Sequence, residues 1–120
     1  MPKTTNKTTD KESTMRHTMV TYTVKPGREE ENAALVRAVF EELAQARPTG
    51  FRYAVFQVAD SRQFVHLYTD EGSTPSVVLQ EVPAFKAFVA DAEDRHEQPA
   101  TFTEPELIGD YRTFEEGAAA

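Results

Sequence analysis

The sequence predicts an α+β fold of the ferredoxin-like type, in which a β-α-β-β-α-β chain forms a four-stranded antiparallel sheet with both helices on one face. Three observations predict this fold. Residues 18–25 alternate apolar and polar side chains, as a half-buried strand does. Residues 28–47 and 84–96 carry apolar side chains at helical spacing. Between them, residues 51–70 contain two strand-like runs around a short polar turn.

The first strand is expected to turn one apolar face toward the core, because Val20, Tyr22 and Val24 alternate with Met19, Thr21 and Thr23. Pro26-Gly27 ends this strand. The helix that follows has glutamates in its first turn, where the helix dipole favours anions. Pro48 and Gly50 are expected to end it.

The central hairpin is predicted from residues 51–58 and 63–69, which are rich in β-branched and aromatic residues. Residues 59–62 supply the turn. Along residues 63–69, one face carries aromatic side chains that end in polar groups, and the other face is apolar. The sheet is therefore expected to be covered on both faces.

The second half of the chain is expected to contain a short helix over residues 76–81 and a longer one over residues 84–96, with Pro83 between them. Residues 98–105 are expected to form a loop. The last strand is predicted over residues 106–114, because this run contains Leu107, Ile108 and Tyr111.

A single domain over residues 18–114 is expected, with a disordered tail over residues 1–17 and a short tail over residues 115–120. The chain has no cysteine and no apolar run near the roughly 18 residues of a membrane span, so a cytoplasmic protein without a membrane partner is expected. A formal net charge of −7 makes nucleic acid an unfavourable partner.

One sheet face of a ferredoxin-like chain has no helix over it. Apolar and aromatic residues are too numerous on both faces here for one of them to stand in water. We therefore expect this face to pack against the same face of a second copy in a homodimer.

The chain resembles the antibiotic biosynthesis monooxygenase domain family of dimeric α/β barrels. Short fragments over residues 18–113 carry the resemblance: Lys25-Pro26-Gly27 after the first strand, Arg52-Tyr53 and Phe64-Val65 in the hairpin, and the helical run from Pro83 to Phe88. The resemblance implies oxidation of quinol-like or polycyclic aromatic substrates by O₂ without a flavin or a metal. It does not extend to the haem-degrading branch, whose tryptophan is absent from this chain.

His66 is the candidate catalytic residue, because an imidazole in a strand beside Tyr68 has a pKa suited to proton transfer near neutrality. The alternative is a buried, hydrogen-bonded histidine of the core or the dimer interface. Tyr22, Tyr53 and Tyr68 are candidate substrate-binding residues, or core aromatics. His96 is a further candidate, but it is expected to cap a helix C-terminus, where protonation is favoured.

Two functions remain open on these residues. The first is a cofactor-independent monooxygenase acting on a small aromatic or quinol-type substrate. The second is a non-catalytic homodimeric domain that binds a small ligand or has a structural role. No metal site is expected, because the few histidines do not group with carboxylates at ligand spacing, and no cofactor motif occurs.

Overall fold

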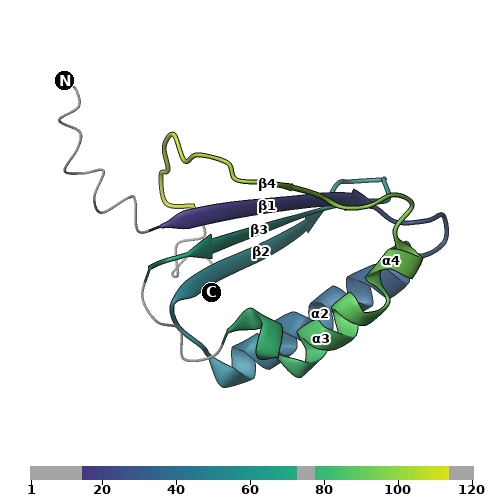
Figure 1. Ribbon diagram of the computed structural model, residues 1–120, viewed down its shortest axis with the longest axis horizontal. Helices are drawn as coiled ribbons and strands as arrows, with labels where there is room; N and C mark the ends of the chain where they lie inside the picture. Colours follow the sequence, from purple (N-terminus) through teal and green to yellow (C-terminus); the bar gives the residue numbers. More distant parts are fainter. Residues whose placement is uncertain (1–14, 73–77, 114–120) are drawn as a thin grey trace.

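The computed structural model describes residues 15–72 and 78–113. Its sheet has the strand order β2-β3-β1-β4, and every pairing in it is antiparallel. Helices α2 and α3 lie side by side under one face of this sheet (Figure 1). The predicted ferredoxin-like order of elements is therefore confirmed.

Strand β1 (Arg16–Thr23) begins two residues before the predicted start at Thr18. Its first residues pair with the end of β3 (Gln63–Asp70), and the ring nitrogen Nδ1 of His17 lies 2.8 Å from the Thr69 hydroxyl. His17 thus lies in the sheet and not in the expected tail. Residues 1–14 and 114–120 lie outside the described part of the chain.

Helix α2 (Glu29–Ala46) has three glutamates in its first turn, as expected. It ends at Arg47, whose backbone is left-handed with φ 50° and whose N–H donates to the Leu43 carbonyl over 2.7 Å. This conformation ends the helix just before Pro48, so the predicted end of the helix is confirmed.

The central hairpin consists of β2 (Phe51–Gln57) and β3, joined at residues 58–62, within one residue of the prediction. Asp60 supplies the positive φ of 55° that the turn needs. Asp tolerates this region better than most residues do.

The second helical region differs from the prediction, because the helix expected over residues 84–96 is divided into two. A 3₁₀ turn η1 (Leu79–Glu81) precedes α3 (Pro83–Ala90), and a short helix α4 (Ala92–Arg95) follows a break at Asp91. Part of the predicted first short helix lies outside the described residues. Proline at the first position of α3 agrees with the prediction. The Glu42 carboxylate of α2 accepts a hydrogen bond from the Ala84 N–H over 3.1 Å, which ties the start of α3 to α2.

The prediction of the last strand is wrong. Strand β4 (Thr101–Thr103) lies in the segment expected to be a loop, and it pairs with Met19–Thr21 of β1. Residues 106–113 form no strand, and the three residues that suggested one are exposed: Leu107, Ile108 and Tyr111. Pro105, which lacks an N–H, follows β4 closely and prevents its extension.

The core fills the space between the sheet and the helices. Its most buried apolar side chains come from β1, α2, β3, η1 and α3 and from residues directly adjoining them: Tyr22, Val24, Val36, Val39, Phe64, Leu79, Val82 and Phe88. The opposite sheet face carries Met19, Val65 and Leu67, all only partly buried, with no helix of the described residues over them (Figure 1). Among the described residues, none of the helices combines the length and the apolar character needed to cross a membrane.

Candidate functional site

The end of β1 and the end of α4 meet at the closed end of the layer between sheet and helices. A bridge joins Val24 to His96, immediately after each element ends. This pairing brings Arg95 and His96 against Tyr22, which lies on the helix-facing side of β1. The site is therefore built from residues far apart in the sequence.

Five polar side chains form a continuous hydrogen-bonded chain through this layer. The Tyr53 hydroxyl lies 2.8 Å from Nδ1 of His66, and Nε2 of the same ring lies 2.8 Å from the Tyr22 hydroxyl. The Asn32 amide donates to the Tyr22 oxygen over 2.9 Å, and Arg95 Nε donates to the Asn32 carbonyl oxygen over 2.9 Å. We call these five residues the polar chain.

Arg95 anchors one end of the polar chain in the core. Its side chain is fully buried, donates to the Phe88 carbonyl over 2.7 Å and lies 5.0 Å from the centre of the Phe88 ring. Within the described residues it makes no ion pair, and its Nη1 has no hydrogen-bond partner. Burial of this cation lowers its pKa from the usual value.

The other members of the polar chain are uncharged near neutral pH. Burial, with a smaller effect of His96, lowers the pKa of His66 to about 4. Burial raises the pKa of Tyr22 to about 12 against the opposing effects of Asn32 and Arg95, and burial also raises the pKa of Tyr53. The imidazole is therefore neutral, and both phenols keep their protons.

His96 does not cap a helix through its side chain. Its ring stacks on Tyr22 with centroids 4.1 Å apart, and its buried Nε2 has no partner among the described residues. Burial and the neighbouring Arg95 lower the pKa of His96. The expectation that this position favours protonation is therefore wrong, because desolvation outweighs the dipole of the short helix α4.

Tyr68 lies outside the polar chain but touches its end. It packs edge-on against Tyr53 with centroids 6.2 Å apart, and it stacks on Phe51 at 5.4 Å. Phe40 of α2 stacks on the other side of Tyr53 at 5.1 Å. We call Phe40, Phe51, Tyr53 and Tyr68 the aromatic cluster; all four are partly exposed.

The polar chain therefore has a closed end and an accessible end. Arg95 and Asn32 are fully buried, and Tyr22 and His66 are only 5% and 6% exposed. Tyr53 alone among the five is partly exposed, and it lies within the aromatic cluster. Tyr53 therefore joins the buried polar chain to the partly exposed aromatic cluster.

The five residues predicted from the sequence thus form one series of neighbouring contacts: His96, Tyr22, His66, Tyr53 and Tyr68. Asn32 and Arg95 were not predicted. Both had a sequence signal: Asn32 precedes Val36 and Val39 by four and seven residues, and Arg95 follows Phe88 by seven. A polar residue on an apolar helix stripe is a candidate for a buried, hydrogen-bonded side chain.

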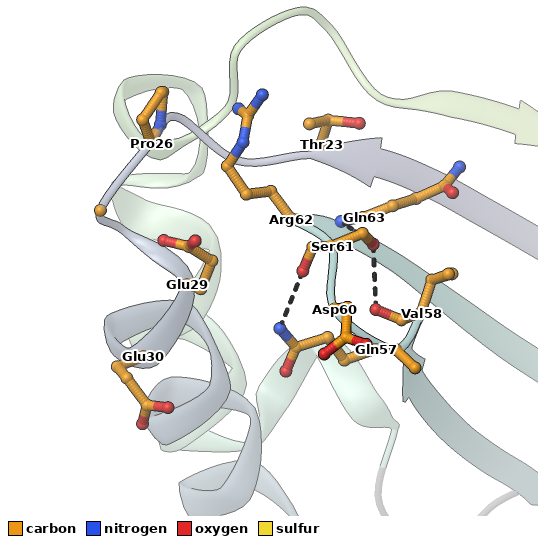
Figure 2. Close-up of a pocket in the computed structure, with 12 residues that line it drawn as sticks. Thr23, Pro26, Glu29, Glu30, Gln57, Val58, Asp60, Ser61, Arg62 and Gln63 are labelled. Carbon is orange, nitrogen blue, oxygen red and sulfur yellow. Dashed lines mark hydrogen bonds between the residues drawn. The ribbon is translucent and has the colours of Figure 1, made fainter.

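The structure also has an open depression of about 1140 Å³ between the hairpin turn and the start of α2. Figure 2 shows Glu29, Glu30 and Asp60 around it, with Ser61 hydrogen-bonded to its neighbours in the turn. None of the predicted site residues lines this depression. Across residues 15–72 and 78–113, no group of three histidine or acidic side chains is placed to hold a metal ion.

Comparisons with known proteins agree with this architecture. No family model matches the chain, and no curated protein sequence matches it. Solved structures do match. A structure from Nitrosomonas europaea described as "Putative antibiotic biosynthesis monooxygenase" is similar at a TM-score of 0.63 and 19% identity, over 78% of this chain and 90% of that one.

Two further structures show the same likeness. One from Bacteroides thetaiotaomicron with the same description has a TM-score of 0.65 and 12% identity, over 78% of this chain and 90% of that one. PA3566 from Pseudomonas aeruginosa has a TM-score of 0.61 and 19% identity, over 79% and 95%. At these identities the likeness concerns the fold, and at that level the predicted resemblance is confirmed.

Proposed function

We propose that this protein is a cofactor-independent monooxygenase that oxidises a small aromatic or quinol-type molecule with O₂. The observation that carries the proposal is the Tyr53 end of the polar chain, where a phenol bonded to His66 lies inside a partly exposed aromatic cluster. Aromatic rings bind a flat aromatic ligand by stacking. A single hydroxyl on the inner side of such a site orients the ligand by a hydrogen bond to the ligand's oxygen. The likeness to structures described as monooxygenases supports the same class.

The proposed reaction needs no added reductant. A methylene group between two aryl rings becomes a carbonyl, one oxygen atom of O₂ enters the product, and the other leaves as water. The substrate supplies all the electrons that O₂ receives. Both methylene hydrogens end in the water that forms.

In this proposal Tyr53 contacts the substrate oxygen and His66 acts behind it. Both ring nitrogens of His66 are already hydrogen-bonded to phenols, and its pKa of about 4 makes it a weak base. His66 is therefore a positioning residue for Tyr53. Tyr68 holds the Tyr53 ring by edge contact, and His96 packs on Tyr22 in the middle of the polar chain.

The test measures O₂ uptake with anthrone as the substrate and the incorporation of one labelled oxygen atom from ¹⁸O₂. Tyr53→Phe keeps the ring and removes the hydroxyl, so turnover should fall by ~10²-fold, the usual cost of losing one well-placed hydrogen bond to a developing charge. Tyr111→Phe removes the same hydroxyl from a residue that is 84% exposed and should leave turnover unchanged. Equal rates for the two variants would contradict the role of Tyr53.

A second function is favoured by one observation. A histidine with both nitrogens satisfied and a lowered pKa is also what a non-catalytic core requires. In that case the domain binds the aromatic molecule without oxidising it. Binding of anthrone without any O₂ uptake above the buffer rate would select this function.

We also propose that the chain is a homodimer formed through the sheet face opposite the helices. Met19, Val65 and Leu67 on that face are only partly buried in one copy. His66 points to the helices and contacts Phe88 of α3. Each copy in this dimer would therefore contain its own complete polar chain, away from the interface.

A further inference from the structure

The hydrogen bonds of the polar chain all run in the same sense from donor to acceptor, and Arg95 determines that sense. A guanidinium can only donate hydrogen bonds, so the Asn32 atom facing it is the carbonyl oxygen. The Asn32 amide nitrogen therefore faces Tyr22 and donates to its oxygen. The orientation of a buried amide, which is ambiguous on its own, is fixed by its neighbour.

The Tyr22 proton must then go to His66. Within the described residues, the Tyr22 hydroxyl has two polar neighbours, the Asn32 amide and Nε2 of His66. The first is a donor, so only the second can accept. If Nε2 carried a proton instead, the Tyr22 proton would be buried without an acceptor, at a residue that is only 5% exposed.

The same logic extends to Tyr53. A neutral imidazole has one donor and one acceptor nitrogen. With Nε2 accepting from Tyr22, Nδ1 carries the proton and donates to the Tyr53 oxygen. The Tyr53 hydroxyl proton then has no acceptor within the polar chain.

We propose that Arg95 and Asn32 hold His66 as the Nδ1–H tautomer, so that Tyr53 presents its proton to an acceptor oxygen of the ligand. The ligand half of this proposal rests on the proposed function. The ligand class is then an aromatic ketone, quinone or phenolate. In the proposed reaction, the same donor stabilises the negative charge that develops on the substrate oxygen when the methylene proton leaves.

The first measurement uses the full chain without any variant. Long-range ¹H–¹⁵N spectra at pH 7 distinguish protonated from unprotonated imidazole nitrogens, and His17→Gln and His66→Gln variants identify the His66 signals. We expect a protonated Nδ1 and an unprotonated Nε2. The opposite assignment overturns the proposal, whatever the protein does with substrates.

The second measurement uses a variant that should reverse the donor and acceptor roles along the polar chain. In Asn32→Asp, the new carboxylate has nearly the same shape, pairs with Arg95 and accepts the Tyr22 proton. Tyr22 can then accept from Nε2, and Nδ1 can accept from Tyr53, so the tautomer should switch to Nε2–H. Gln45→Glu adds the same charge at an exposed position of α2 and should leave the tautomer unchanged. An unchanged tautomer in folded Asn32→Asp contradicts the assigned roles of Asn32 and Arg95.

The third measurement tests the ligand class by binding alone. 1,4-Naphthoquinone offers acceptor oxygens and naphthalene offers none, and the absence of cysteine removes the thiols that would react with the quinone. The quinone should bind about tenfold more tightly to the natural chain, and this advantage should vanish in Asn32→Asp. Equal binding of both probes overturns the ligand half, whereas a failure of O₂ uptake alone overturns only the proposed function.

Discussion

At the scale of single residues, the burial of His66 makes the stability of the protein depend on pH. Its pKa is about 4 in the folded state and about 6.5 in an unfolded chain, so the unfolded state binds the proton more readily. The stability is complete above pH 6.5 and decreases as the pH falls toward 4. This group alone accounts for a loss on the order of 3 kcal/mol.

Urea unfolding followed by circular dichroism at pH 7 and pH 4.5 measures this loss. His66→Gln removes the titrating ring, so the variant should be less stable at pH 7 but should lose less stability on acidification. Other groups titrate in both proteins, and the difference between the two pH dependences isolates His66. Parallel pH dependences would show that the histidine is not desolvated.

The candidate site was only partly predictable at this scale. Alternation along β1, β2 and β3 places Tyr22, Tyr53 and His66 on one face, which the sequence pattern shows directly. Arg95 and Asn32 come from α4 and α2, and their contact depends on how two distant helices end against the sheet. The signal in the sequence was the helical spacing of these two residues from Val36, Val39 and Phe88.

At the scale of elements, the backbone of Arg47 at the end of α2 is in a left-handed conformation that is strained for a residue other than glycine. A left-handed backbone disfavours any residue with a Cβ, and glycine removes this cost. Arg47→Gly should therefore raise the free energy of unfolding by about 1 kcal/mol. Its side chain is exposed, so little contact is lost.

The control applies the same substitution at the middle of the helix. Arg37 is exposed within α2, where glycine lowers helix stability, so Arg37→Gly should lower the free energy of unfolding by about 1 kcal/mol. Urea midpoints of the two variants should move in opposite directions. A shift in the same direction would show that Arg47 is not a left-handed end of the helix.

Elements with a strong local pattern were predicted within two residues, as α2 and the central hairpin show. Strand β4 was not, because its position is decided by tertiary pairing. The bridge between Val24 and His96 brings the chain beside β1, so the first residues able to pair after it, Thr101–Thr103, form the strand. A strand of three residues shows little periodicity in the sequence. The strand was therefore predicted in the more apolar run that follows, residues 106–114.

At the scale of the whole molecule, the sheet separates two surfaces with different roles. The helix-facing side holds the polar chain, and the opposite side presents apolar side chains that a single copy leaves partly exposed. A stable dimer buries about 800 Å² from each partner, which a four-stranded sheet face can supply. The proposed dimer and the proposed site are therefore structurally independent and can be tested separately.

Leu67 lies on the open face in the central strand β3, so a charge there should break the dimer. Leu67→Asp should raise the dimer dissociation constant by at least ~10²-fold, because an unpaired carboxylate would be buried between two sheets. Light scattering should then report the mass of one chain, whereas Val89→Asp, at an exposed position of α3, should leave the dimer intact. Because His66 and Tyr53 lie on the other side of the sheet, a folded monomeric variant should retain the His66 tautomer. A monomeric natural chain, or an unchanged mass in Leu67→Asp, would contradict pairing through this face.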